Sequence, residues 1–173
     1  MFFNLRLLGI TFGLVAILNA AWAAPVPCRD GSRDLSIDNG KVLDMKRAAP
    51  QGVAIRAFVS GRVTRNFAER KNGHGTVHDH FEIQIGNSAD DVLEVVYSED
   101  FGEMPAPKVG AFVEACGDFI NASAKNRGYD PSPSGAIIHW VHQSNSSRHD
   151  SGFVMIGDDL YGNGEDRNPR KFD

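Results

Sequence analysis

The chain has little cysteine, little excess charge and no long helical pattern. Each of these shortages excludes a type of site or fold. The two cysteines, Cys28 and Cys116, lie too far apart in the sequence to suggest a two-cysteine metal site. The formal net charge of −4 argues against a broad nucleic-acid-binding surface, although it leaves room for a local basic pocket. No long stretch carries a convincing helical period, so a helical fold is not expected.

Recognised catalytic motifs are also missing. The sequence contains no Gly-x-Ser-x-Gly, no His-Glu-x-x-His, no phosphate-binding glycine loop and no haem motif. Gly73 with His78 and His80 has a weak similarity to the first cupin motif, but Gln84 stands where that motif needs glutamate. No second cupin motif follows, so the cupin fold is a minor alternative and the reaction class stays open.

The N-terminus has the pattern of a secretory signal peptide. Arg6 precedes the apolar run Leu7–Leu18, and small residues follow it. We expect cleavage after Ala23, which removes residues 1–23, because a cut one residue later would leave Pro25 first. The run is shorter than the about 20 residues of a membrane span, so an uncleaved anchor is the weaker alternative. The predicted location is periplasmic or secreted, with no transmembrane segment after cleavage.

In an oxidising compartment the two cysteines are predicted to form a disulfide. A bridge from Cys28 to Cys116 would tie the N-terminal segment to a strand. Closing so long a loop contributes roughly 4 kcal/mol on the chain-entropy model. The alternative is two independent thiols, with Cys116 buried as a small hydrophobic residue.

Apolar and polar residues alternate with period two from Val53 onward, which predicts five or six short strands. The first stretch, 53–67, is interrupted by Gly61, the usual mark of a bulge or a sharp bend. The other predicted strands are 76–86, 92–97, 111–121, 136–142 and 153–156. One short helix is expected near residues 42–47.

These elements predict an all-β fold, a small five- to six-stranded barrel like the oligonucleotide/oligosaccharide-binding (OB) fold. A β-sandwich is the alternative. The predicted organisation is a signal peptide at 1–23, an N-terminal segment at 24–52, the barrel domain at 53–161 and a polar tail at 162–173. We expect a monomer.

All six histidines fall in two clusters, which predicts one polar site assembled from two parts of the barrel. The first cluster holds His74, His78 and His80. Alternation puts His78, His80 and Glu82 on one polar strand face, where two imidazoles can reach one metal ion. The alternative is a solvated strand face that happens to carry histidines.

The second cluster contains His139, Trp140, His142, Arg148 and His149. His139 and His142 would lie on opposite faces of a regular strand, so they share a site only through a bulge or if His142 already lies in the loop. His139 could equally be a core histidine with one hydrogen bond. Trp140 is expected to pack, with a stacking platform for a base or sugar as the alternative. Arg148 and His149 are candidates for binding an anion at the end of the site; the alternative is that they belong to a hydrated polar loop.

At these clusters the sequence resembles a bacterial family of short, often secreted proteins, the domain of unknown function family 3465. That family carries His-Gln-x-Phe on one strand, and residues 78–81 match it with Asp79 in place of glutamine. It later carries Gly-Val-Ile-His-Trp-Thr-His, which residues 135–142 match, and then Arg-His-x-x-Gly, matched by Arg148, His149 and Gly152. The match covers roughly 53–161.

The departures from that family lie in its loops. Its Asp-Pro step is replaced by Ser144 and Asn145, which weakens any mechanism that needs a carboxylate there. Its His-Asn after the third strand is absent, and residues 97–100 occupy the region. The resemblance implies a barrel-like fold and a shared site, but no reaction.

Two functions fit the sequence. The first is an extracytoplasmic phosphodiester hydrolase, nuclease-like, acting on nucleic acid or another phosphodiester, with a divalent metal ion on His78 and His80 as candidate cofactor. Its candidate catalytic residues are His78, His139, His142, Arg148 and His149, and its candidate binding residues are His80, Glu82 and Trp140. The second is a non-catalytic OB-like module that binds a ligand or partner.

Overall fold

The computed structural model describes residues 26–48, 50–71, 75–125, 130–144, 146 and 149–162. The predicted signal peptide and nearly all of the predicted tail lie outside these ranges, as do His74 and Arg148. Among the described residues, no helix is both long and apolar enough to cross a membrane.

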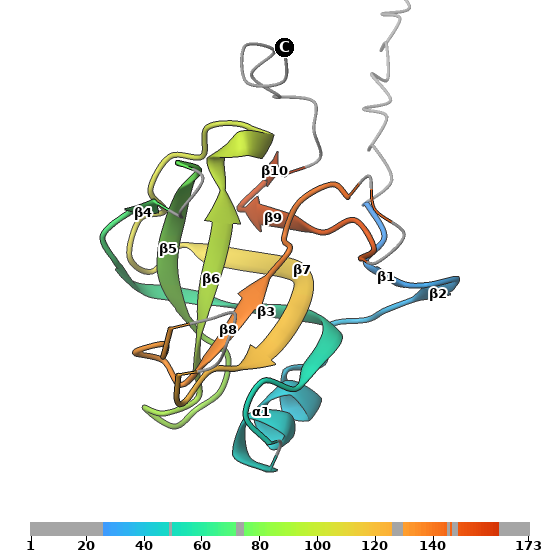
Figure 1. Cartoon of the computed structure of the whole chain (residues 1–173), viewed down its shortest axis with the longest axis vertical. Helices are drawn as coiled ribbons and strands as arrows, with labels where there is room; N and C mark the ends of the chain where they lie inside the picture. The colour runs from blue at the N-terminus through green and yellow to red at the C-terminus, as the bar shows by residue number, and fades with distance from the viewer. Residues whose placement is uncertain are drawn as a thin grey trace, which may run out of the picture.

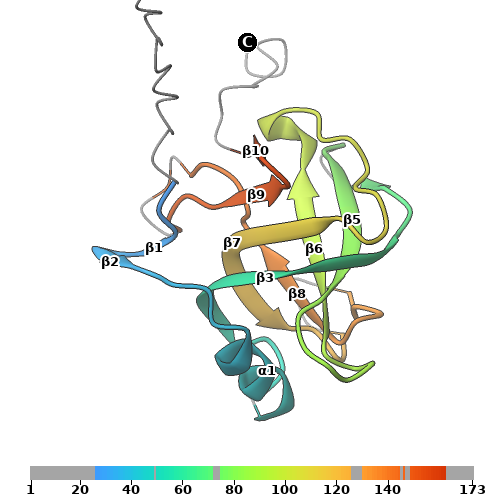
Figure 2. The same ribbon diagram turned by 180° about the vertical axis from the view of Figure 1, so that it is seen from behind.

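Five strands close a barrel (Figures 1 and 2). They run in the order β3, β5, β6, β8, β7 and back to β3, and every pairing is antiparallel except that of β6 with β8. This is the small, OB-like barrel predicted from the alternation. The bounds are β3 Ala54–Asn66, β5 Val77–Gln84, β6 Val92–Ser98, β7 Phe112–Asn121 and β8 Ala136–His139.

The long strand β3 belongs to both halves of the barrel. It pairs with β7 from Ala54 to Arg62 and with β5 from Arg62 onward. At Gly61 an added Cβ would lie 2.3 Å from the carbonyl oxygen of Gln84, so only glycine fits this close approach. The predicted irregularity in this strand is confirmed, and the register shift itself falls between Val63 and Arg65.

The barrel interior holds the main apolar core. Inward-facing side chains from the strands are almost fully buried, among them Phe81, Ile83, Leu93, Val95 and Ile138. The predicted short helix is α1, Asn39–Ala48, which begins where Asp38 Oδ1 accepts a hydrogen bond from the Lys41 N–H. Its Val42 and Leu43 join the core, and the helix lies at one end of the barrel (Figure 1).

Further short elements surround the barrel. They are β1 Arg29–Asp30 paired with β2 Arg33–Asp34, β4 Arg70–Lys71 on β5, η1 Glu99–Phe101, and β9 Phe153–Ile156, which lies on β7 and pairs with β10 Asp159–Tyr161. The sequence predicted β9 but not β1, β2, β4 or β10, because two or three residues are too few for an alternation to show. The expected strand 136–142 is wrong at its end, since β8 stops at His139.

The predicted disulfide is present. Cys28 and Cys116 are bridged, with their Cα atoms 5.6 Å apart, and both residues are buried. The bridge fixes the segment that carries β1 and β2 onto β7. The alternative of two independent thiols is therefore wrong.

Candidate functional site

The strand register places one row of side chains across the outer face of the barrel. His80 on β5 is paired with Val96 on β6, and the parallel register of β8 continues the row to His139. His139 is paired with Asp118 on β7, and Asp118 with Arg56 on β3. Residues paired across neighbouring strands share a face of the sheet, so all five strands contribute to this row.

Both histidine clusters meet on this face. The ring centroids of His78 and His139 are 6.1 Å apart, and those of His78 and His80 are 6.4 Å apart. Groups separated by more than about 10 Å usually act independently, and these lie well inside that limit. The expected convergence is thus found in the geometry, while the roles of these residues remain predictions.

A turn at Trp140 brings His142 to the same face. Trp140 has φ 55°, a left-handed conformation that non-glycine residues rarely adopt. The chain therefore leaves the strand at once, and the Trp140 ring centroid lies 5.2 Å from that of His139 and 5.5 Å from that of His142. His142 is buried and stacks on Phe101 with centroids 3.7 Å apart. Its Nδ1 lies 2.9 Å from the carbonyl oxygen of Gln143, so Nδ1 carries the hydrogen.

His149 is oriented by a carboxylate. Its Nδ1 lies 2.9 Å from Oδ2 of Asp118, whose Oδ1 accepts a 3.0 Å hydrogen bond from Nη1 of Arg56. A carboxylate that is paired with a guanidinium only accepts, so Nδ1 of His149 donates and Nε2 keeps its lone pair in the neutral ring. Trp140 stacks on the imidazole, with centroids 4.2 Å apart and planes 12° apart.

The His149 pair is open to solvent. The His149 side chain is 28% exposed and that of Asp118 is 15% exposed. A pocket of about 180 Å³ lies beside them, and its lining residues are Asp30, Ala54, Ile55, Arg56, Asp118, His149 and Asp150. A small group can therefore reach the imidazole.

A second carboxylate–imidazole pair lies at the other end of the row. Nδ1 of His80 is 2.6 Å from Oε1 of Glu94, and Oε2 of Glu94 accepts a 2.5 Å hydrogen bond from Ser132. The two side chains are only 9% and 2% exposed. Burial alone would raise the pKa of Glu94, but the hydrogen bonds from His80 and Ser132 outweigh it and hold that pKa below its usual value.

Glu82, predicted as a binding residue, is engaged with the protein itself. Its oxygens accept hydrogen bonds from Thr64 at 2.7 Å, Arg65 at 2.9 Å and Ser134 at 2.6 Å. Burial opposes ionisation, but these donors lower the pKa of Glu82 overall. Glu82 and Glu94 thus fasten the segment 132–134 to the outside of β5 and β6.

Burial keeps several of these imidazoles neutral. It lowers the pKa of His139 to about 3, with smaller contributions from the nearby His78 and His142. Burial and neighbouring His80 also lower the pKa of His78, and burial lowers that of His142. Neutral imidazoles have a lone pair for a metal ion or a proton.

The potential metal ligands that lie close together are not the histidines His78 and His80 that the sequence predicted. Within the described ranges, three donor atoms lie mutually within 4.8 Å only at Glu69, Asp79 and Glu99. Asp79 alternates with His78 and His80 on β5, so it faces away from them. Burial, followed by repulsion from Glu99, raises the pKa of Asp79 to about 6. His78 and His80 remain candidate ligands with no third ligand arranged around them in the part of the chain that is described.

Sequence reasoning missed several residues of this face. Asp118, Glu94 and Arg56 had no distinguishing signal among 22 acidic residues and 18 basic ones, and Ser132 had none either. Arg70 is paired with His78 across β4 and β5, and its side chain is exposed at the edge of the face. A basic residue near a histidine pattern is a usable signal for an anion site, and it was applied to Arg148 beside His149 but not to Arg70.

No family model, no curated protein and no solved structure matches this chain. The similarity to the domain of unknown function family 3465 therefore stays a prediction.

Proposed function

We propose that this chain is a phosphodiester hydrolase whose general base is His149, at the outer face of the barrel. The observation that carries the proposal is the Arg56–Asp118–His149 arrangement. It fixes the tautomer of a solvent-accessible imidazole and leaves Nε2 as the atom that can take a proton.

In this mechanism Nε2 of His149 removes a proton from a water molecule as the water oxygen bonds to phosphorus. The bond from phosphorus to the leaving oxygen breaks, and that oxygen takes a proton from bulk water on the far side. Asp118 stabilises the imidazolium that forms, because the charge develops next to a carboxylate. Histidine is the side chain most often used as a general base in such proton transfers.

The basic edge of the face supports a phosphate substrate. Arg70 and Lys71 form β4, are exposed and lie beside His78 on β5. Their charge can attract the phosphate backbone of a nucleic acid to the β5 end of the face, away from His149. The pocket next to His149 is by contrast lined with Asp30, Asp118 and Asp150, so we expect the phosphate to approach from the β4 side.

The role of a metal ion is a separate part of the proposal. The candidate ligands are His78, whose pKa is lowered by burial so that its imidazole is neutral, and His80, whose Nδ1 contacts Glu94 and whose Nε2 is left for a metal ion. A divalent ion there would supply Lewis-acid stabilisation of phosphate charge. Both residues would then act as ligands and not as bases.

A non-catalytic binding module is the second candidate. Several polar groups of the face already hydrogen-bond to one another, as His80 does with Glu94 and Glu82 with Ser134, and are therefore engaged in structure and not in catalysis. This favours the binding module. The OB fold also binds oligonucleotides and oligosaccharides without chemistry on the face of its second and third strands, which are β5 and β6 here. Trp140 would then act as an aromatic contact.

We further propose that the protein works outside the cytoplasm, in the periplasm or secreted, and belongs to the family that its histidine motifs resemble. The disulfide supports the first point, because such bridges persist in oxidising compartments.

The test begins with metal analysis of the purified protein, followed by a screen of phosphodiesters with and without chelator. The screen includes short single-stranded oligonucleotides and bis(p-nitrophenyl) phosphate. We expect hydrolysis that Asp118→Asn abolishes and that the matched control Asp159→Asn, at an exposed position of β10, retains. Absence of hydrolysis of every substrate, with or without metal, would favour the binding module.

A further inference from the structure

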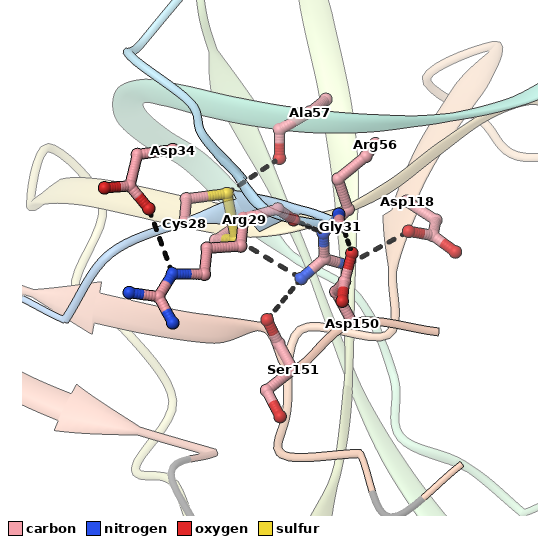
Figure 3. The surroundings of a disulfide bond; sticks show 10 residues. Cys28, Arg29, Gly31, Asp34, Arg56, Ala57, Asp118, Asp150 and Ser151 are labelled. Carbon is pink, nitrogen blue, oxygen red and sulfur yellow. Dashed lines mark hydrogen bonds and ion pairs between the residues drawn. A yellow bond between two sulfur atoms is a disulfide. The ribbon is translucent and has the colours of Figure 1, made fainter. Parts of the chain in front are cut away.

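Arg56 joins the N-terminal segment to the candidate base. Its side chain is 5% exposed and its guanidinium donates to several groups at once (Figure 3). Besides the bond to Asp118, Nε donates to the carbonyl oxygen of Arg29 at 2.9 Å, and Nη2 donates to the carbonyl oxygen of Ser151. Nη2 also lies 3.4 Å from Sγ of Cys116. The guanidinium thus contacts the N-terminal segment, β7 and the loop that contains Ser151 at once.

The disulfide keeps one of those segments in place. Cys28 is bridged to Cys116 on β7, and Arg29, the next residue, presents its carbonyl oxygen to Arg56. The N–H of Gly31 donates to Oδ2 of Asp150 at 2.6 Å, so the same segment also holds the loop that carries His149. The strands β1 and β2 have two exposed residues each and cannot dock by themselves through apolar burial.

We propose that Arg56 is a positioning residue that couples the Cys28–Cys116 bridge to His149, so that His149 keeps its Nδ1–H tautomer only while the bridge is closed. Only the catalytic consequence of this coupling, a change in the activity of His149 as a base, rests on the proposed function. The structural coupling concerns the tautomer of one imidazole and can be measured without any substrate.

Reduction by a dithiol gives the chemical step. The two sulfurs of the bridge each gain a hydrogen and become thiols, while the dithiol loses two hydrogens and forms its own cyclic disulfide. The segment after Cys28 then loses its covalent tether. Arg56 loses the Arg29 acceptor and Asp150 loses the Gly31 donor, so the guanidinium and the loop 149–151 are no longer held against Asp118.

The experiment is a long-range ¹H–¹⁵N correlation spectrum of the full mature chain labelled on histidine nitrogens, before and after reduction with dithiothreitol. In the oxidised protein we expect His149 in the Nδ1–H form. After reduction we expect it to shift toward the Nε2–H form that a freely exposed imidazole prefers. His80, held by Glu94 in the buried pair on the outer face of β5 and β6, reports in the same spectrum whether the fold persists.

Variants separate the bridge from the arginine. Arg56→Met, with the bridge closed, should give the same loss of the Nδ1–H form, and Arg56→Lys should restore it in part. Arg47→Met is the matched control, because Arg47 pairs with Asp91 far from the site. Cys28→Ser with Cys116→Ser should behave like the reduced protein.

Two results would overturn the proposal. One is an unchanged His149 signal after complete reduction with His80 intact, and the other is an unchanged His149 signal in Arg56→Met. If the cysteine variant fails to fold, the Arg56 variants decide alone. A failure of the hydrolase screen leaves these spectra unaffected, so the two proposals fail separately.

Discussion

Two carboxylate–imidazole pairs lie on the outer face of the same barrel and use the same Nδ1 contact, but they are built differently. His80 and Glu94 come from two adjacent strands, are almost fully buried and are covered by Ser132. His149 and Asp118 join a loop to a strand and stay open to solvent. Because its side chains are buried, we expect the His80–Glu94 pair to stabilise the fold. The His149–Asp118 pair is accessible to solvent and can contact a ligand.

The largest expected effect is the loss of activity when the accessible pair is disrupted. His149→Gln should lower kcat on a phosphodiester by about 10²–10⁴-fold, because the general base is lost. Its unfolding free energy should change little, since Asp118 keeps its partner Arg56. Initial rates at saturating substrate, with a urea unfolding curve as control, give both quantities. Equal rates for variant and wild type would show that His149 is not the base.

Removing the carboxylate of the buried pair should instead cost stability. Glu94→Ala leaves His80 and Ser132 buried without their acceptor, and we expect a loss of about 3 kcal/mol in unfolding free energy. Glu94→Gln, which keeps an acceptor oxygen, should lose less. Urea unfolding at pH 7 measures both. A loss below about 0.5 kcal/mol in Glu94→Ala, the size usual for a plain surface substitution, would contradict the structural role.

Acid should destabilise the face through His139. Its folded pKa of about 3 lies below the ordinary 6.5, so the unfolded chain binds more protons between these values. Stability is therefore fully present above pH 6.5 and falls as the pH drops toward 3. This one group predicts a loss of about 2 kcal/mol between pH 7 and pH 5. His139→Gln should remove that part of the pH dependence, and unchanged curves would show that His139 is not buried neutral.

The smallest expected effect concerns the backbone at Trp140. Trp140→Ala and Trp140→Gly both lose the ring contacts with His139 and His149, but glycine adopts a φ of 55° without strain. The glycine variant should be more stable than the alanine variant by about 1 kcal/mol. The reverse order in thermal unfolding would mean that residue 140 does not keep its left-handed conformation.

The strands were predictable because alternation is a local signal. The apolar residues that face the core recur at every second position, as Phe81 and Ile83 do on β5, and this is visible in the sequence. The need for a special residue at Gly61 is visible too. The end of β8 was not, because a left-handed Trp140 has no local signature when the residue is not glycine. The strand ends there because of a tertiary contact: after the turn at Trp140, His142 stacks on Phe101 of η1, which is distant in the sequence.

The site was predictable in its histidines and not in their partners. Segregation into two clusters pointed to His78 and His139 together. Asp118 and Glu94 became partners only through strand register, and acidic residues at alternating positions are common on any barrel surface. Nothing local in the sequence distinguishes the partly exposed His149 from the buried side chain of His80.

The central claim is that the open imidazole performs chemistry on a phosphodiester. The most direct measurement follows binding and cleavage of one short single-stranded oligonucleotide by the oxidised wild type and by His149→Gln. The account predicts similar Kd values, within about threefold, and cleavage by the variant below about 1% of the wild-type rate. Binding without cleavage by both proteins, or equal cleavage by both, would contradict it.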